Sequence, residues 1–104
     1  MPAATIAGKD VHVDSEGFLT DFEEWNEDVA RQFAANIGID LTDAHWKAIH
    51  FMRDDFQAQG ESPTLRRITQ QAGIPTKELF TLFPKKPAKK LAYVAGVPKP
   101  VGCV

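Results

Sequence analysis

The stretch LRRITQQAGIPTKELFTLF, residues 65–83, decides the fold class predicted for this chain. Leu65, Ile68 and Ala72 recur at helical spacing and predict the buried face of a short helix that ends at Gly73. A second short helix is predicted after Ile74-Pro75-Thr76, and its apolar residues are Leu79, Phe80, Leu82 and Phe83. Two short helices joined by a glycine-containing turn form a helix-turn-helix-like corner. The sequence therefore predicts a mainly α fold.

Two helices are predicted before this corner. Thr20 followed by Glu23 fits a capping box and predicts a helix over residues 21–36. Thr42 is a favourable cap and Gly60 a favourable stop, so a longer helix is predicted over residues 42–59. The helical part of the chain thus begins well before residue 65.

The ends of the corner are marked by prolines. Ser62-Pro63 is a capping residue followed by proline, which predicts the start of the third helix. Pro84 ends the fourth helix, and Pro87 opens a fifth that stops at Gly96. We therefore expect about five helices.

The two ends of the chain are predicted to be non-helical. Alternating Val11 and Val13 predict a short β-hairpin near the N-terminus. We expect a single domain over residues 1–104, with a hairpin and turn at 1–20, a helical body at 21–96 and an extended, flexible arm at 97–104.

The composition, 43% hydrophobic and 25% charged, is typical of a globular domain. No apolar run approaches the ~20 residues that span a bilayer, and the first residues lack the pattern of a secretory signal. One cysteine allows no internal disulfide, and His45 and His50 lie on different sides of a helix. We expect a cytoplasmic protein without a cofactor or a metal site.

The net charge of −2 hides an uneven distribution of charge. Residues 1–60 contain twelve acidic and four basic residues, whereas residues 61–104 contain two acidic and eight basic ones. These basic residues form either a solvated face or a face that attracts an acidic protein or RNA. They also surround the only thiol, and positive neighbours favour the nucleophilic thiolate.

That thiol, Cys103, lies in the final stretch VPKPVGCV, residues 97–104. Pro98 and Pro100 predict an extended backbone, and Gly102 predicts a conformationally free position beside the sulfur. Lys89, Lys90 and Lys99 are candidates to stabilise the thiolate or to bind an acidic partner. The alternative is an incidental thiol on a frayed terminus.

The corner at residues 65–83 also resembles the helix-turn-helix motif with which TetR-type repressors bind DNA. In that interpretation Thr76, Lys77, Glu78 and Thr81 face the bases of DNA, with Arg66 and Arg67 near phosphates. An ordinary corner between two packed helices gives the same pattern. DNA is therefore an alternative partner, and Arg66, Arg67 and Lys77 are its candidate residues.

The end of the chain resembles the signature of the DsrC/TusE family. The matching segments are LFPKKPAKK at residues 82–90 and AGVPKPVGCV at residues 95–104, and weaker matches include Trp25, His45-Trp46 and Ser62-Pro63. The resemblance implies a small orthogonal helical bundle. It also implies a sulfur carrier, a sulfurtransferase that holds sulfane sulfur as a persulfide on Cys103 and acts in a relay without independent turnover.

The same resemblance implies partners. The donor would be an upstream sulfur-carrier protein of the TusBCD or DsrEFH type, and the acceptor a tRNA thiolase or a sulfite-reductase-like enzyme. The alternative within the family is an accessory (gamma) protein of dissimilatory sulfite reductase or of sulfur oxidation.

The chain departs from the family pattern at two positions. Ala92 stands where the sulfite-reductase branch carries a second cysteine, which favours the single-cysteine TusE-like branch. Lys86 replaces a glycine of the family pattern, so that pattern alone does not predict the geometry of this turn or the partner surface around it.

Overall fold

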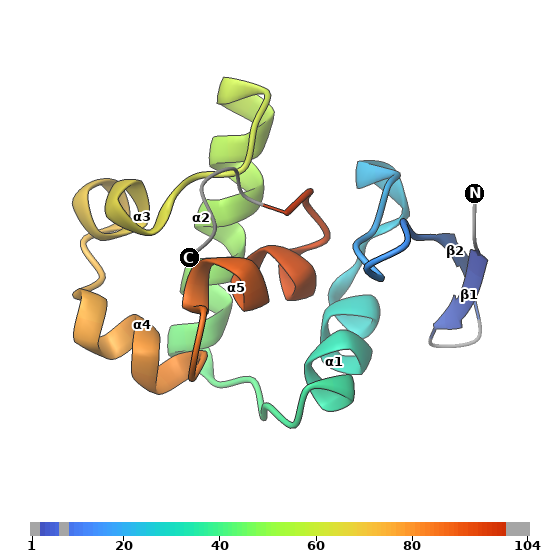
Figure 1. Cartoon of the computed structure of the whole chain (residues 1–104), viewed down its shortest axis with the longest axis horizontal. Coiled ribbons are helices and arrows are strands. Elements are labelled where there is room, and N and C mark those ends of the chain that lie inside the picture. The colour runs from blue at the N-terminus through green and yellow to red at the C-terminus, as the bar shows by residue number, and fades with distance from the viewer. Residues whose placement is uncertain (1–2, 7–8, 100–104) are drawn as a thin grey trace.

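The computed structural model describes residues 3–6 and 9–99, and these residues are mainly helical (Figure 1). The helical elements are η1 (Phe22–Glu24), α1 (Glu27–Asn36), α2 (Asp43–Gln59), α3 (Leu65–Ala72), α4 (Thr76–Leu82) and α5 (Pro87–Ala95). The strands are β1 (Ala3–Ile6) and β2 (Lys9–His12). The predicted mainly α fold with a short N-terminal hairpin is confirmed.

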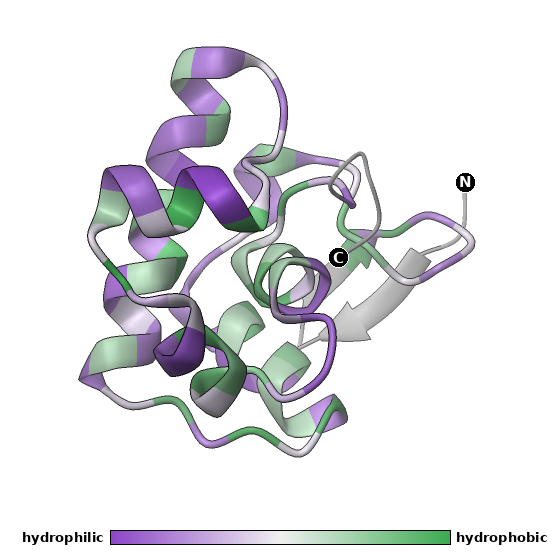
Figure 2. Cartoon of the chain, turned by 60° about the vertical axis from the view of Figure 1, so that its left-hand side comes forward, coloured by the Kyte–Doolittle hydropathy of each residue, from purple (hydrophilic) through white to green (hydrophobic). Residues whose placement is uncertain are grey.

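Helix α5 lies at the centre of the helical body, and it contacts α2, α1 and α4 (Figure 1). Its residues Leu91, Ala92, Val94 and Ala95 are buried, and the small side chains among them let the neighbouring helices approach closely. Figure 2 shows the apolar colouring along this helix and along α1. The last helix is thus a core element, and the segment that follows it starts from a buried position.

The long helix α2 has the boundaries expected from the sequence. Thr42 is its N-cap, and Gly60 ends it in the left-handed conformation with φ 79°. The Nδ1 atom of His45 accepts the backbone N–H of Thr42 at 3.0 Å, which completes a capping box. The Nε2 atom lies 2.8 Å from the carbonyl oxygen of Leu82, so His45 joins α2 to the end of α4.

The corner between α3 and α4 packs as the apolar spacing predicts except at Phe80, which is 46% exposed. Ile68, Ile74, Leu79 and Phe83 are buried, and Gly73 ends α3 with φ 70°. Leu65 and Ala72 are only partly buried against the core. In Figure 1 this corner lies on the side of α2 opposite to α1.

Two predicted helix starts are wrong. The first α-helix begins at Glu27 and not at residue 21, because the backbone of Trp25 is extended and Asn26 caps the helix by accepting the N–H of Val29 at 2.9 Å. The third helix begins at Leu65 and not at Pro63, because Thr64 is its cap. In both cases another capping residue lies a few positions further on.

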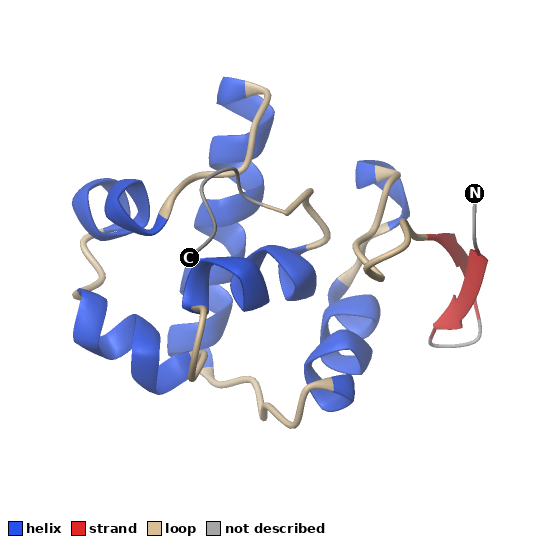
Figure 3. Cartoon of the chain, viewed as in Figure 1, coloured by secondary structure: helices blue, strands red, loops and turns tan. Residues whose placement is uncertain are grey.

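The hairpin lies at the edge of the helical body (Figure 3). Its strands are antiparallel, with Ala3 opposite His12 and Ile6 opposite Lys9. Glu24 of η1 accepts the backbone N–H of His12 at 2.7 Å and lies 2.8 Å from its Nδ1 atom. Within residues 3–6 and 9–99, no helix is long and apolar enough to cross a membrane.

Candidate functional site

The segment that leads to the predicted thiol begins at a tight turn after α5. Gly96 adopts φ 70° and ψ 32°, and the N–H of Val97 donates to the carbonyl of Ala92 at 3.1 Å. This left-handed turn is a common way to end a helix and satisfy its last carbonyls. Val97 is completely buried, so the turn is anchored in the core. We call residues 96–99 the arm root.

Two side chains hold the end of α5 from outside the helix. Trp25 Nε1–H donates to the carbonyl of Val94 at 2.9 Å. The guanidinium of Arg53 donates to the carbonyl of Ala95 at 2.8 Å and to that of Phe22 at 2.9 Å. The bonds to Val94 and Ala95 satisfy carbonyls that α5 itself leaves free. We call Trp25, Arg53 and the carbonyls that they bind the root clamp.

The Arg53 guanidinium lies over two aromatic rings, with its Cζ atom 3.7 Å from the centre of the Phe22 ring and 4.2 Å from that of Trp25. Such contacts stabilise the cation. Burial lowers the pKa of Arg53 to about 10, against the opposing effect of Glu23 and Asp54. Arg53 is therefore still a cation at neutral pH.

The arm root is bound at two further points. Ser62 Oγ donates to the carbonyl of Pro98 at 2.5 Å, so the serine expected to start a helix instead binds the arm root. Lys99 Nζ donates to Glu16 Oε1 at 3.2 Å. The direction in which the chain leaves the body is thus fixed by contacts to the loop before α3 and to the loop after β2.

The structure brings the three candidate lysines near one another but does not give them the same role. Lys89 Nζ lies 4.0 Å from Glu16 Oε1, so Lys89 and Lys99 share one carboxylate. Lys90 Nζ donates to the carbonyl of Pro84 at 2.5 Å and thereby holds the turn before α5. Cys103, Gly102 and Pro100, which were also singled out from the sequence, lie outside the described residues.

An open pocket of about 530 Å³ lies beside the lysines. Its lining is provided by Glu16, Gly17, Phe18, Asn36, Ile37, Lys85, Lys86, Lys89, Lys90 and Tyr93. Lys85 and Lys86 form one wall and have φ values of 58° and 40°. The turn at residue 86 therefore adopts the left-handed conformation that suits glycine, although lysine occupies it. We call this site the lysine-rimmed pocket.

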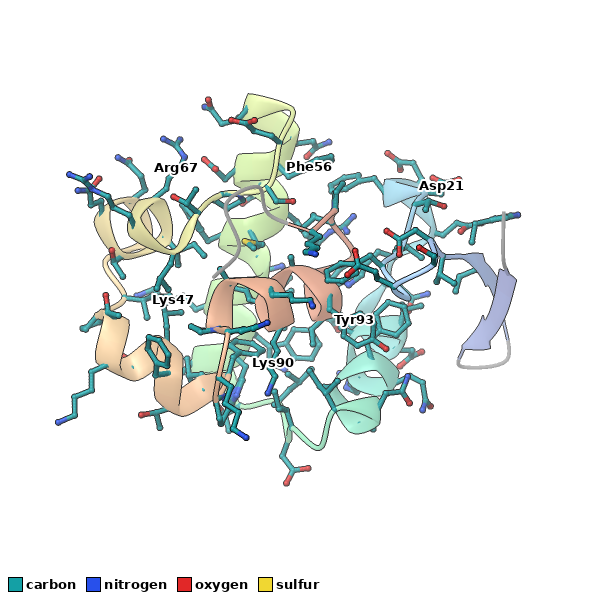
Figure 4. All side chains as sticks on the ribbon, viewed as in Figure 1. Asp21, Lys47, Phe56, Arg67, Lys90 and Tyr93 are labelled. Atoms are coloured by element: carbon teal, nitrogen blue, oxygen red, sulfur yellow. The ribbon has the colours of Figure 1, made fainter. Side chains whose placement is uncertain are left out.

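The three candidate DNA-binding residues are not equivalent. Arg66 and Lys77 are exposed, but Arg67 binds the buried Asp55 of α2. Its Nη2 atom lies 2.7 Å from Oδ1 and its Nε atom 2.8 Å from Oδ2. The hydrogen bonds that Arg67 donates to the Asp55 carboxylate raise the pKa of Arg67. Arg67 thus joins α3 to α2, and Figure 4 shows it on the α3 side of the molecule.

The part of the chain that the structure describes contains no group of three or more potential metal-binding side chains. Both ring nitrogens of His45 are occupied by the hydrogen bonds to Thr42 and Leu82. Because Nδ1 accepts a backbone N–H, the proton is placed on Nε2, which donates to the carbonyl. His45 is therefore a structural residue in this fold.

The chain belongs to the family described as DsrC like protein, whose model matches residues 5–104. It is 40% identical to "Sulfurtransferase TusE homolog" of Haemophilus influenzae over 95% of this chain and 97% of the relative. It is 36% identical to "Sulfurtransferase TusE" of Escherichia coli over 93% of this chain and 95% of the relative.

Solved structures of the family have the same fold. The NMR structure of DsrC from Allochromatium vinosum is 37% identical, with a TM-score of 0.87 over 99% of this chain and all of the other. The crystal structure of the oxidized gamma-subunit of the dissimilatory sulfite reductase from Archaeoglobus fulgidus is also 37% identical. Its TM-score is 0.83, again over 99% of this chain and all of the other. The DsrC/TusE membership predicted from the sequence is confirmed.

Sequence reasoning missed the residues that hold the arm root. The sequence singles out Trp25 only as a match to the family pattern, and it indicates no functional role for Arg53, Ser62 or Glu16. A lone arginine on a long helix carries no local signal that it will bind the end of a distant helix. For Ser62 the local signal was misleading, because Ser-Pro also favours a helix start.

Proposed function

We propose that this protein is a sulfur-relay protein that carries sulfane sulfur as a persulfide on Cys103. The observation that carries the proposal is the family match over residues 5–104 together with relatives named as sulfurtransferases at 36% and 40% identity. The only cysteine of the chain is Cys103. It follows an arm root that is fixed at both of its ends.

The chemistry is a balanced exchange between sulfur atoms. The Cys103 thiolate attacks the outer sulfur of a persulfide on the donor protein, forming a new S–S bond. The donor's own S–S bond breaks, and the donor cysteine leaves as a thiolate. The product is a persulfide on Cys103, with no net oxidation. Attack by an acceptor thiolate on the outer sulfur repeats the exchange and regenerates the Cys103 thiolate.

The body supports this chemistry by fixing the origin of the arm. Cys103 is four positions after Lys99, so covalent geometry limits the distance between their Cα atoms to about 14 Å. Lys99 and Lys89 lie at the start of this span and would favour the thiolate over the thiol. A fixed origin restricts the volume that the sulfur searches and reduces the entropy lost on entering a partner.

The relay needs a donor and an acceptor. We propose a TusBCD- or DsrEFH-like carrier as the donor and a tRNA thiolase or a sulfite-reductase-like enzyme as the acceptor. Ala92 supports the single-cysteine branch, because a buried alanine in α5 cannot form a disulfide with Cys103. The likeness to the sulfite reductase gamma-subunit favours an accessory role beside that enzyme as a second candidate.

The test is intact-mass spectrometry of the full chain after treatment with polysulfide. We expect additions of sulfur atoms that a reductant removes and that the Cys103→Ser variant does not acquire. A wild-type protein that stays unmodified, while a general thiol reagent still reaches Cys103, would contradict the proposal. Copurification with a sulfite reductase would favour the second candidate.

A further inference from the structure

The lysine-rimmed pocket has a firm apolar and aromatic floor. The Tyr93 ring stacks on Phe33 of α1 with ring centres 4.6 Å apart and meets Phe18 edge-on at 5.8 Å. Its hydroxyl oxygen accepts a hydrogen bond from Asn36 Nδ2 at 3.2 Å. Figure 4 shows Tyr93 between α5 and α1, with Lys90 further along α5. A side chain entering the pocket therefore meets a floor that is already ordered.

The charges around this floor are unbalanced. Four lysines and one glutamate line the pocket. Glu16 is shared by Lys89 and by Lys99 of the arm root, and Lys90 is bound to a carbonyl. Within residues 3–6 and 9–99, neither Lys85 nor Lys86 has a carboxylate partner. The wall formed by these two residues is thus an uncompensated positive surface.

The backbone of this wall gives a second, independent indication. Lys85 and Lys86 both have positive φ values, which the Cβ atom of any residue except glycine makes unfavourable. Strained positions of this kind persist when the surroundings impose them, and they concentrate at functional sites. Glycine at residue 86 would relieve the strain but would remove a charge from the rim.

We propose that the lysine-rimmed pocket binds an acidic segment of the sulfur-relay partner, with Lys86 as a specificity residue. An apolar side chain of the segment contacts the floor at Tyr93, and its carboxylates pair with Lys85, Lys86 and Lys89. This inference rests on the proposed function, because it assumes that a partner protein approaches the arm. It identifies that partner by an exposed acidic segment with an apolar residue at its centre.

Two observations favour a peptide over RNA. Glu16 already places a carboxylate on Lys89 and Lys99, so the rim accepts this group. The apolar floor can contact an apolar side chain of a peptide, whereas it gives a phosphate backbone nothing to bind. Because the side chains of Lys99 and Glu16 are 36% and 47% exposed, their ion pair is weak and a partner's carboxylate can replace Glu16.

The experiment measures binding of a fluorescein-labelled peptide, Glu-Glu-Phe-Glu-Glu, to the full chain by fluorescence anisotropy at low salt. We expect Lys86→Gly and Lys89→Gln each to weaken binding about three-fold. The matched control is Lys77→Gln, which removes an exposed lysine from α4, outside the pocket, and should leave affinity unchanged. A peptide with glutamine in place of glutamate should bind much more weakly. Amide shifts in NMR spectra should concentrate at residues 16–18, 36–37 and 85–93.

Equal losses in the Lys77→Gln and Lys86→Gly proteins, or shifts spread over the whole surface, would overturn the proposal. So would the absence of peptide binding, or tighter binding of a single-stranded RNA of equal charge. Intact mass after polysulfide treatment is measured on the same variants. If Cys103 takes up sulfur but the pocket binds no peptide, only this inference fails. If the pocket binds and Cys103 takes up no sulfur, only the proposed function fails.

Discussion

Gly96→Ala is the substitution that tests the arm root most directly. A Cβ atom at residue 96 would lie 2.5 Å from Trp25 Cδ1 and 3.0 Å from Leu19 Cδ2. The indole cannot simply move aside, because its Nε1–H is bound to the Val94 carbonyl and Arg53 covers its face. The substitution therefore strains the backbone and also breaks the root clamp.

The expected cost has two parts. In the folded state, a left-handed backbone costs a residue other than glycine about 1–2 kcal/mol. Alanine also restricts the unfolded chain more than glycine does, which offsets about 0.4–1 kcal/mol of this loss in stability. Displacement of Trp25 leaves the Val94 carbonyl without a partner, which costs about 1–3 kcal/mol. We expect a total loss of about 2–4 kcal/mol in the free energy of unfolding.

Gly73→Ala is the matched control. Gly73 ends α3 with the same φ of 70°, but a Cβ atom there meets nothing within 4 Å. This variant should lose only the backbone term, about 1 kcal/mol. Urea unfolding of both variants and the wild type, followed by circular dichroism, measures the difference. If Gly96→Ala loses no more than Gly73→Ala, the clamp at Trp25 does not hold the arm root as described.

Two further predictions concern the turn before α5 and the root clamp. Lys86→Gly should raise the free energy of unfolding by about 0.5–1 kcal/mol because it relieves left-handed strain, whereas Lys86→Ala should not; equal urea midpoints for the two variants would contradict this. Arg53→Met should lower the free energy of unfolding by about 1–3 kcal/mol because the Ala95 carbonyl loses its donor, whereas the Phe22 carbonyl keeps the N–H of Trp25. Burial lowers the pKa of Arg53 only to about 10, so Arg53 is protonated in the folded and unfolded states from pH 6 to 9. The loss should therefore be constant over that range, and a loss that changes there would point to another group.

The elements that the sequence predicts best are those with local signals at both ends. The second helix lies between a capping threonine and a stop glycine, and its boundaries, Asp43–Gln59, agree with the prediction. The fifth helix lies between Pro87 and Gly96, and Pro87–Ala95 agrees equally well. Such signals act on the chain's own backbone and need no knowledge of distant contacts.

The two wrong helix starts have a common cause. Thr20-x-x-Glu23 and Ser62-Pro63 both satisfy a local rule for helix starts. At each place the tertiary structure uses the segment differently: the extended backbone at Trp25 lets the indole reach Val94, and Ser62 turns to the carbonyl of Pro98. A local pattern contains no information about such partners.

The same limit explains why the root clamp and the bond from Ser62 to the arm root were not predicted. Trp25 and Val94 are 69 residues apart in the chain, Arg53 and Ala95 are 42 apart, and Ser62 and Pro98 are 36 apart. Each bond ends on a backbone carbonyl, which every residue has, so the sequence of the acceptor carries no signal. The sequence does identify the lysines, because their charge can be read from it. It does not show which of them bind other groups of the protein and which are free.

Helix α5 connects the two parts of the candidate site. One face carries Lys89 and Tyr93 of the lysine-rimmed pocket, and its last turn carries the carbonyls that Trp25 and Arg53 bind. A partner bound in the pocket is therefore held at a fixed position relative to the arm root. Only the residues after Lys99 then separate the bound partner from Cys103. Docking and sulfur transfer would thus be coupled by the geometry of a single helix, and lengthening the chain after Lys99 should weaken transfer without weakening docking.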